Sequence, residues 1–226
     1  MGARTVDFGS VLARLARSTV MEDGDLSGVL RAITEAAAAA LQVERVNIWM
    51  FDRERTRIRC IQAYERGVNR HTQGDEILAS VAPSYFAALA ELRTVAAFDA
   101  LNDPRTRELA GYLQPRGITT LLDAPLYQGG ELAGVVCHEH VGPPRQWSAD
   151  EQAFAGSVGD FVSLAIEADR RIRAERSLRE GEELFRAVGD RLPDAMLLVD
   201  ASDPSSLTVR YANEAACRLS GYSPRS

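Results

Sequence analysis

The stretch ITTLLDAPLYQGGELAGVVCHEH, residues 118–140, decides the fold. It holds two apolar runs, residues 118–127 and 131–140, on either side of Gly129 and Gly130. A Gly-Gly pair between two such runs is a strong signal for a two-residue hairpin turn, because the favoured turns need positive φ at their central positions. The stretch therefore predicts a long antiparallel hairpin.

A second hairpin is predicted upstream. Residues 45–52 (RVNIWMFD) and 57–64 (RIRCIQAY) alternate between apolar and polar side chains around a short polar turn. Alternation with a period of two is the pattern of a half-buried strand. In the second run we expect Ile58, Cys60 and Gln62 to share one face. The two hairpins together predict one antiparallel sheet.

Helices are expected before, between and after the hairpins. Apolar residues recur at helical spacing over residues 8–20 and 26–42, and again over 77–92 with an interruption at Pro83. Residues 94–99 predict a short strand and residues 103–109 a short helix.

Ser148 and Glu151 form a capping box that starts a further, very long helix with no clear stop before Gly181. Acid-before-base pairs at i, i+4 are expected to support it at Glu167/Arg171, Asp169/Arg173 and Glu175/Arg179. Apolar residues at 3- and 4-residue steps predict the seam of a homodimer, formed by Val158, Phe161, Ala165, Ala168 and Ile172.

After Pro193 the pattern returns to strands, over residues 195–200 and 207–213, followed by a helix from Glu214. Two strands and one short helix bury too little area to be stable alone. We therefore expect the front part of a second domain, and divide the chain into residues 1–168, a helical coiled-coil linker over 169–191, and residues 192–226.

The composition excludes several classes of function. All 26 basic residues of the 226 are arginines, which rules out a P-loop lysine and Schiff-base chemistry. The formal charge of −6 and the scattered arginines predict no direct nucleic-acid partner. Three widely spaced cysteines argue against a disulfide scaffold, and the lack of a long apolar run predicts a cytoplasmic chain without membrane insertion.

The order of elements over residues 8–170 resembles the GAF domain, a small-ligand and sensory module of bacterial signalling proteins. Residues 185–226 resemble the start of a PAS domain. The resemblance implies an α+β fold, namely an antiparallel sheet with helices on both faces, a long C-terminal signalling helix and an incomplete PAS-like α/β segment. It rests on short matching segments: residues 36–52, 102–105, 116–118, 123–126, 130–137 and 147–151 for GAF, and 185–187, 192–195, 199–200, 211–216 and 221–224 for PAS.

The resemblance also implies a role. It predicts a homodimeric input module that binds an unknown small-molecule ligand and relays a signal to a C-terminal output domain. The arrangement is typical of sensor histidine kinases and diguanylate cyclases, and we expect a sensor histidine kinase. No catalytic motif of such an output is present in the chain, and the sequence names no cofactor. The ligand pocket that a GAF fold would form is expected to be lined by Tyr85, Phe86, Phe98, Asp99, Tyr112 and His138.

The cluster Cys137-His138-Glu139-His140 raises two alternatives to a simple ligand pocket. Its two histidines share one strand face, and a tetrahedral metal site needs more ligands than they supply, so we expect no metal. Phytochrome-type GAF domains have a Cys-His pair beside a bound tetrapyrrole, which would correspond to His138. The chain has Asn102-Asp103-Pro104 where those photoreceptors have Asp-Ile-Pro.

Two further alternatives stay open. One GAF subfamily, free methionine-(R)-sulfoxide reductase, uses thiol chemistry, which here would require Cys60 and Cys137. The mid-strand position of Cys60 and the apolar neighbours of Cys137 instead favour buried, inert thiols. The other alternative is a GAF domain with a filled pocket that acts only as a dimerisation spacer.

Overall fold

The computed structural model describes residues 6–18, 25–202 and 208–221. It divides into two compact units, residues 1–169 and residues 170–226. The first unit holds an antiparallel sheet with helices on both faces, and the second a small two-stranded sheet. The expected α+β fold with a long C-terminal helix is therefore confirmed.

Within the described residues the main sheet has seven strands. Their order is β3-β2-β1-β7-β6-β5, and β4 also pairs with β2. The central strand β1 joins the two hairpins, since it pairs antiparallel with both β2 and β7. The strands are β1 (Arg45–Phe51), β2 (Arg57–Glu65), β3 (Arg70–Thr72), β4 (Glu76–Leu78), β5 (Val95–Ala97), β6 (Ile118–Gln128) and β7 (Glu131–Val141).

The turn between β6 and β7 has the predicted backbone, with φ of 58° at Gly129 and 84° at Gly130. In β2, by contrast, the predicted face of one residue is wrong. Cys60 pairs with Trp49 and Gln62 with Ile48, so a β-bulge lies between them. Because a bulge adds one residue to a strand, Gln62 turns to the face opposite Cys60.

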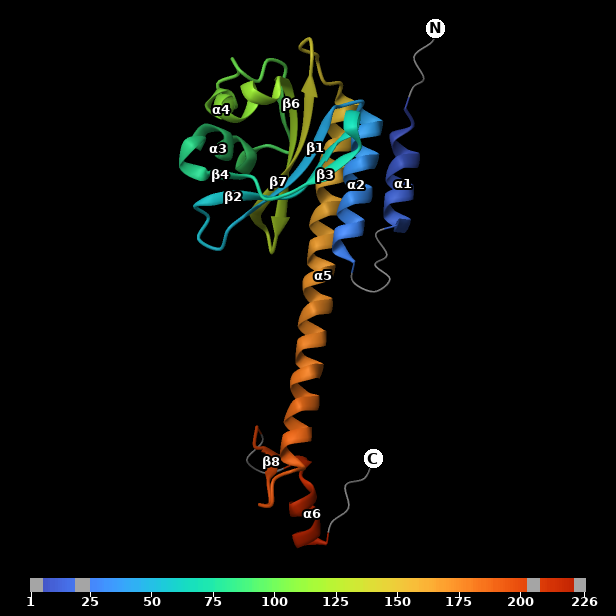
Figure 1. Cartoon of the computed structure of the whole chain (residues 1–226), viewed down its shortest axis with the longest axis vertical. Coiled ribbons are helices and arrows are strands. Elements are labelled where there is room, and N and C mark those ends of the chain that lie inside the picture. The colour runs from blue at the N-terminus through green and yellow to red at the C-terminus, as the bar shows by residue number, and fades with distance from the viewer. Residues whose placement is uncertain (1–5, 19–24, 203–207, 222–226) are drawn as a thin grey trace. The chain divides into compact units, whose positions relative to one another are not determined.

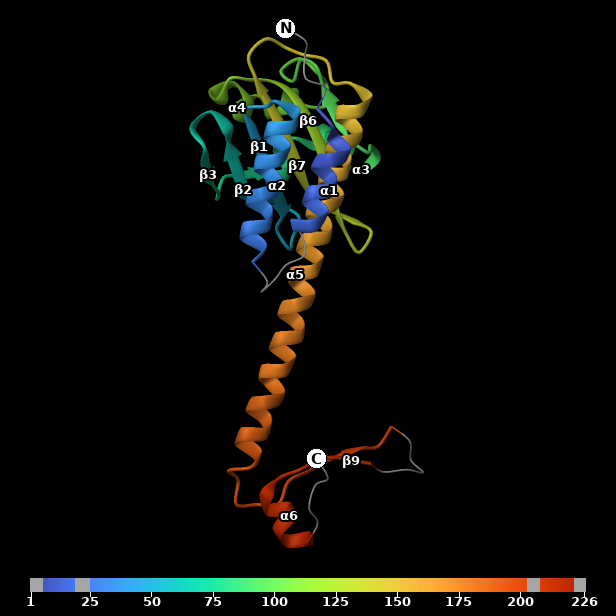
Figure 2. The ribbon, with the colours of Figure 1, turned by 90° about the vertical axis from the view of Figure 1, so that its right-hand side faces the viewer.

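One face of the sheet, the helix face, is covered by α1 (Phe8–Ser18), α2 (Leu26–Leu41) and the first part of α5 (Ala149–Gly189). Figure 1 shows these helices on the same side of the sheet, and Figure 2 shows α1 over the space between α2 and α5. Gly159 lets α5 approach β6 closely, since a Cβ there would lie 3.2 Å from the Cβ of Ala124. The core between these layers includes Ile33, Leu41, Ile48, Val136, Phe154 and Val158.

The opposite face, the pocket face, is covered by α3 (Pro83–Glu91), a 3₁₀ turn over Arg107–Leu109 and α4 (Ala110–Leu113) (Figure 1). Pro83 occupies the first turn of α3, where its missing N–H costs nothing. The predicted helical start at residue 77 is wrong, because β4 and a 3₁₀ turn over Ala79–Val81 precede α3. A second core packs here, including Tyr85, Leu89, Leu113, Leu121 and Val135.

The capping box at the start of α5 is confirmed. The Ser148 amide donates to Glu151 Oε2 at 2.8 Å, and the Glu151 amide donates to Ser148 Oγ at 3.2 Å. Further along α5, two of the predicted i, i+4 ion pairs, Glu167/Arg171 and Glu175/Arg179, are wrong, because each arginine pairs with the glutamate that follows it. Arg171 pairs with Glu175, and Arg179 pairs with Glu183.

The second unit contains the hairpin of β8 (Leu197–Asp200) and β9 (Thr208–Ala212), followed by α6 (Glu214–Ser220). Asn213 caps α6, since its Oδ1 accepts a hydrogen bond from the Ala216 amide at 2.9 Å. The hairpin leaves Leu197 and Val209 more than half exposed. None of the helices in the described parts of the chain combines the length and apolar character that a bilayer crossing needs.

Candidate functional site

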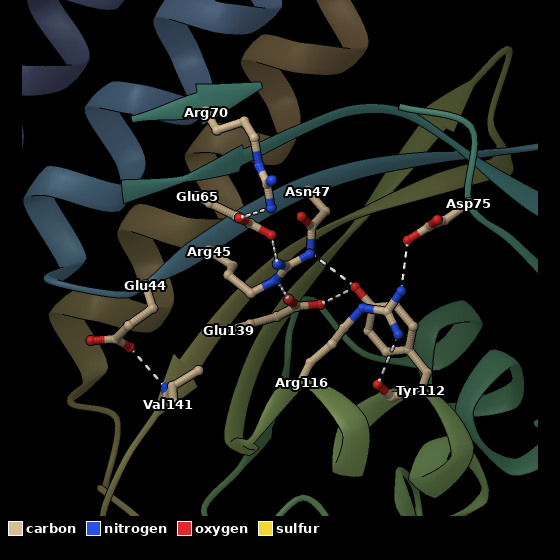
Figure 3. Close-up of polar contacts among 10 residues, drawn as sticks. All are labelled: Glu44, Arg45, Asn47, Glu65, Arg70, Asp75, Tyr112, Arg116, Glu139 and Val141. Carbon is tan, nitrogen blue, oxygen red and sulfur yellow. Dashed lines mark hydrogen bonds and ion pairs between the residues drawn. The ribbon is translucent and has the colours of Figure 1, made fainter. Parts of the chain in front are cut away.

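A buried polar cluster on the pocket face is centred on Glu139 of β7 (Figure 3). Arg45 lies directly opposite Glu139 on β1, and its Nε donates to Glu139 Oε2 at 3.0 Å. The hydroxyl of Tyr112, from α4, donates to Glu139 Oε1 at 2.9 Å. Asn47 Nδ2 in turn donates to the Tyr112 hydroxyl oxygen at 3.3 Å. Both carboxylate oxygens of Glu139 thus have partners.

The charge of Glu139 is compensated inside the protein. Burial raises the pKa of Glu139, and Arg45 and Tyr112 act against that rise. Burial acts to lower the pKa of Arg45, but the neighbouring Glu139 outweighs it and the pKa lies above its usual value. Arg45 also forms an ion pair with Glu65, which bonds Arg70 at 2.7 Å (Figure 3). The chain of alternating charges runs from the buried site to the surface.

A second buried group lies beside the first and contains Asp123, Cys137 and Tyr85. Asp123 of β6 and Cys137 of β7 are directly opposite each other in the sheet. The Tyr85 hydroxyl, from α3, donates to Asp123 Oδ2 at 2.5 Å and lies 3.7 Å from Cys137 Sγ. Within the described residues, Asp123 Oδ1 has no partner in hydrogen-bond geometry.

Asp123 differs from Glu139 in its electrostatics. Burial raises the pKa of Asp123 to about 8, and the nearby charge of Glu139 adds to the rise. Hydrogen bonds from Tyr85, from the Cys137 side chain and from the His138 backbone oppose it. Among the described side chains, none forms a salt bridge with Asp123, which is only 1% exposed. A carboxyl group buried in this way favours its neutral form.

A cavity of about 10 Å³ lies beside the two groups. That volume is about the space of one water molecule. The cavity is lined by Trp49, Ile58, Ile77, Tyr85, Leu109, Tyr112, Leu113, Leu121, Asp123, Cys137 and Glu139.

An open cleft of about 410 Å³ lies outside the cavity. Ile77, Leu109 and Tyr112 line both spaces, so their side chains form the partition between cavity and cleft. At the cleft, Arg116 bonds Asp75 at 2.8 Å and stacks over the Tyr112 ring at 4.2 Å (Figure 3). A molecule in the cleft would therefore lie one side-chain layer above the buried carboxyl groups.

The structure brings two of the predicted pocket residues, Tyr85 and Tyr112, into the cavity wall. Phe86 packs between Phe51 and Tyr85 outside that wall, with ring centroids 5.2 and 5.3 Å apart. Phe98 is 46% exposed, and Asp99 accepts a hydrogen bond from Asn102 Nδ2 at 2.8 Å. Neither of these last two lines the cavity.

The predicted pocket position of His138 is corrected by the structure. Cys137 and Glu139 line the cavity, so the residue between them points to the helix face. There His138 is fully buried, and its Nδ1 lies 2.7 Å from the carbonyl oxygen of Leu122. Burial lowers the pKa of His138 to about 4, so the imidazole is neutral at physiological pH.

Asp123, Glu139, Arg45 and Asn47 were not predicted as site residues. A usable signal existed, because each is a polar residue within or beside an otherwise apolar strand run. Strands buried on both faces read as nearly continuous apolar runs. A charged or amide side chain in such a run indicates a buried polar site.

The two cysteines of the sheet are poor nucleophiles in this structure. Burial raises the pKa of Cys60 to about 12 and that of Cys137 well above its usual value. The thiolate is the reactive form, so neither residue supplies it at neutral pH. Within the described residues, no three His, Cys, Asp or Glu side chains are grouped as a metal site would require.

The residues expected to form a dimer seam fall into two sets. Val158 and Ala165 are buried in the first unit, with 0% and 3% exposure, so neither is free to contact a partner. Phe161 packs partly against the same core. Ala168 is exposed and Ile172 is half-buried.

Comparison with known proteins identifies two domain families. The GAF domain model matches residues 25–166, and a PAS domain model matches residues 183–226. A search of curated protein sequences found no match.

Solved structures share the fold at low sequence identity. The phycoerythrobilin-bound GAF domain of a cyanobacterial phytochrome is 19% identical, with a TM-score of 0.62, 75% of this chain covered and 100% of that one. Free methionine-R-sulfoxide reductase from Neisseria meningitidis is 15% identical (TM-score 0.60; 76% and 95% covered). A domain assigned to a two-component sensor histidine kinase of Sinorhizobium meliloti is 22% identical (TM-score 0.51; 69% and 98% covered).

Proposed function

The chain belongs to the GAF domain family, and on that premise we propose that its first unit is the sensory input domain of a signalling protein. The domain recognises a small molecule on the pocket face of the sheet. It relays the occupancy of that site through α5 to the PAS domain that follows and to a histidine-kinase output. The relay is a population shift, whose size cannot exceed the difference in the ligand's affinity for the two conformations.

The observation that carries this proposal is the buried Asp123 carboxyl. An ionisable group in an apolar core costs free energy unless it is paired. Glu139 has its cation in Arg45, whereas the described partners of Asp123 are uncharged, namely the Tyr85 hydroxyl, the Cys137 thiol and the His138 amide, and Asp123 lines a cavity. A strongly shifted pKa beside a cavity is a common mark of a binding site.

The proposed route from the site to α5 is α3. Tyr85 of α3 bonds Asp123, and Arg93 follows the C-terminal end of that helix at Glu91. The Arg93 guanidinium donates two hydrogen bonds to Asp160 of α5, at 3.0 and 2.5 Å. A displacement of α3 by a ligand would therefore act directly on α5.

We further propose that the protein is a homodimer through the outward face of α5. Leu164 is 61% exposed there, and Ala168 follows one turn later. Residues four positions apart share a helix face. Val158 and Ala165 are not part of this surface, because the chain's own core buries them.

Native mass spectrometry of the chain purified from its own host tests whether the domain binds a ligand. Wild-type protein should carry an additional mass that denaturation releases, and Asp123→Asn should lose it. Asp99→Asn is the matched control, because Asp99 lies outside the cavity wall. A bare polypeptide mass for the wild type would contradict ligand recognition.

The dimerisation spacer is the second candidate. The small volume of the cavity, about 10 Å³, favours it, because no ligand larger than a water molecule fits without movement of the partition. If the domain is only a spacer, native mass spectrometry of the wild type should give the mass of the bare polypeptide. The thiol-enzyme alternative has no comparable support, since the pKa values of Cys60 and Cys137 are both raised.

A further inference from the structure

The cavity beside Asp123 has the size of one small polar species. Its volume of about 10 Å³ is close to the smallest that holds a water molecule. An ammonium ion has nearly the dimensions of water, and a primary amine presents the same group at the end of a carbon chain. Any direct occupant of this cavity must be of that size.

The charge of the cavity wall favours a cation. Asp123 lines the cavity, its Oδ2 accepts from Tyr85, and the Cys137 thiol and the His138 amide are further uncharged neighbours of the carboxyl group; among the described residues no cation pairs with it. Glu139 adds a second carboxylate, already matched by Arg45. An ionised Asp123 would therefore lack the cationic partner that Glu139 has in Arg45.

The remaining wall favours a hydrogen-bonding cation over a metal ion. Most of its residues are apolar or aromatic, and Trp49 and Tyr112 meet edge to face at 5.5 Å between centroids. Hard metal ions take six or more oxygen ligands, which this wall does not supply. An ammonium group needs fewer oxygens, because its N–H bonds also interact favourably with aromatic faces.

We propose that the cavity beside Asp123 is a binding site for an ammonium group, either the free ammonium ion or the charged end of a primary amine. This inference rests on the proposed sensory function and names its ligand class. The group donates to Asp123 Oδ1 and lies against the aromatic wall.

Proton transfer gives a simple route of entry. Neutral ammonia or amine enters, and its nitrogen lone pair takes the proton of the Asp123 carboxyl group, which leaves a carboxylate and an ammonium ion. Because the pKa of the Asp123 carboxyl group is raised while the cavity is empty, this proton is present near neutral pH. The carbon chain of an amine would pass the partition into the cleft, whose rim carries Asp75, Glu76 and Glu108.

Thermal unfolding of the full chain tests the site. At equal ionic strength, ammonium chloride should raise the melting temperature of the wild type above its value in sodium chloride, by roughly 3–5 °C near ten times the Kd. Methylammonium should act similarly. Tetramethylammonium has no N–H donor and exceeds the cavity, so it should have no effect.

Two comparisons complete the test. Asp123→Asn should abolish the ammonium effect and Asp99→Asn should keep it. If butylammonium acts at lower concentration than ammonium, the ligand is an amine with a chain in the cleft; the reverse order indicates the free ion.

Equal melting temperatures of the wild type in ammonium and sodium chloride would overturn the proposal, whether or not Asp123→Asn folds. A bound molecule without an amine, found by mass spectrometry, would overturn it while the sensory function stands. A bare mass together with an Asp123-dependent ammonium shift would support the ammonium site and contradict the recognition of a host ligand that stays bound through purification.

Discussion

The guanidinium of Arg93 and the carboxylate of Asp160 form a two-point contact, with N–O distances of 3.0 and 2.5 Å. Arg93 follows α3 on the pocket face, and Asp160 belongs to α5 on the helix face. Both side chains are more than half exposed. The contribution of such a pair to stability is at most about 1 kcal/mol, so its importance lies in the two elements that it joins.

Glycines of α5 offer a test of this contact. A Cβ at Gly156 would lie 2.9 Å from Arg93 Nε, whereas nothing lies within 4 Å of a Cβ at Gly181. Alanine is favoured over glycine inside a helix by up to about 1 kcal/mol. Gly181→Ala should therefore stabilise its helix, and Gly156→Ala should gain less because it displaces Arg93. Urea unfolding, followed by helical circular dichroism, measures the stability of both variants. Equal gains in stability would contradict an Arg93 guanidinium that lies against Gly156.

The dimer proposal predicts different results for two positions of α5. Leu164→Glu should give a folded monomer, because Leu164 is 61% exposed. Val158→Glu should unfold the first unit, since it places a charge where the side chain is fully buried. Sedimentation and circular dichroism separate these outcomes. A Leu164→Glu protein that remains dimeric would place the interface elsewhere.

The buried carboxyl predicts a pH dependence with a definite sign. The folded-state pKa of Asp123, about 8, lies above the unfolded value of about 4. The folded state thus holds the proton more tightly, and stability from this group is present below about pH 4 and lost as pH rises toward 8. Relative to Asp123→Asn, the wild type should lose more than about 1 kcal/mol of unfolding free energy between pH 5 and 8. If the unfolding free energies of the two proteins change with pH in parallel, the pKa of Asp123 is not raised.

The cysteines predict an order of reactivity. Cys217 is half-buried, while Cys60 and Cys137 are buried and their pKa values are raised. Iodoacetamide at pH 7.5 should therefore label Cys217 first in the native protein, and all three in urea. Rapid labelling of native Cys137, located by peptide mass mapping, would instead favour thiol chemistry.

Much of the fold could be predicted from local patterns. The Gly129-Gly130 turn, the alternation over residues 45–52 and the capping box at Ser148 each specify their structure through nearby residues. The helix expected from residue 77 failed because residues 76–78 pair with β2. Such a pairing depends on a distant strand and leaves little trace in the local sequence.

The site was harder to predict, because it depends on register. The turn pairs Gln128 with Glu131, and an unbroken ladder would place Asp123 opposite Val136. A bulge near Leu126 shifts the ladder by one residue and brings Asp123 opposite Cys137. A one-residue shift changes which side chains share a face. His138 was misplaced for a different reason, namely that its role came from resemblance. Alternation separates His138 from Cys137 and Glu139, but it does not say which of the two faces carries the pocket.

Hydrogen exchange of the α5 amides over residues 150–169 tests the central claim most directly. The Asp123→Asn substitution is made in three backgrounds: the wild type, Arg93→Gln and Arg107→Gln. The Arg107→Gln background is the control, because Arg107 is an exposed arginine on the same face of the sheet. If the pocket face is coupled to α5 through α3, Asp123→Asn changes this exchange in the wild-type and Arg107→Gln backgrounds and has a smaller effect in Arg93→Gln. Exchange that Asp123→Asn leaves unchanged in the wild-type background would contradict the relay.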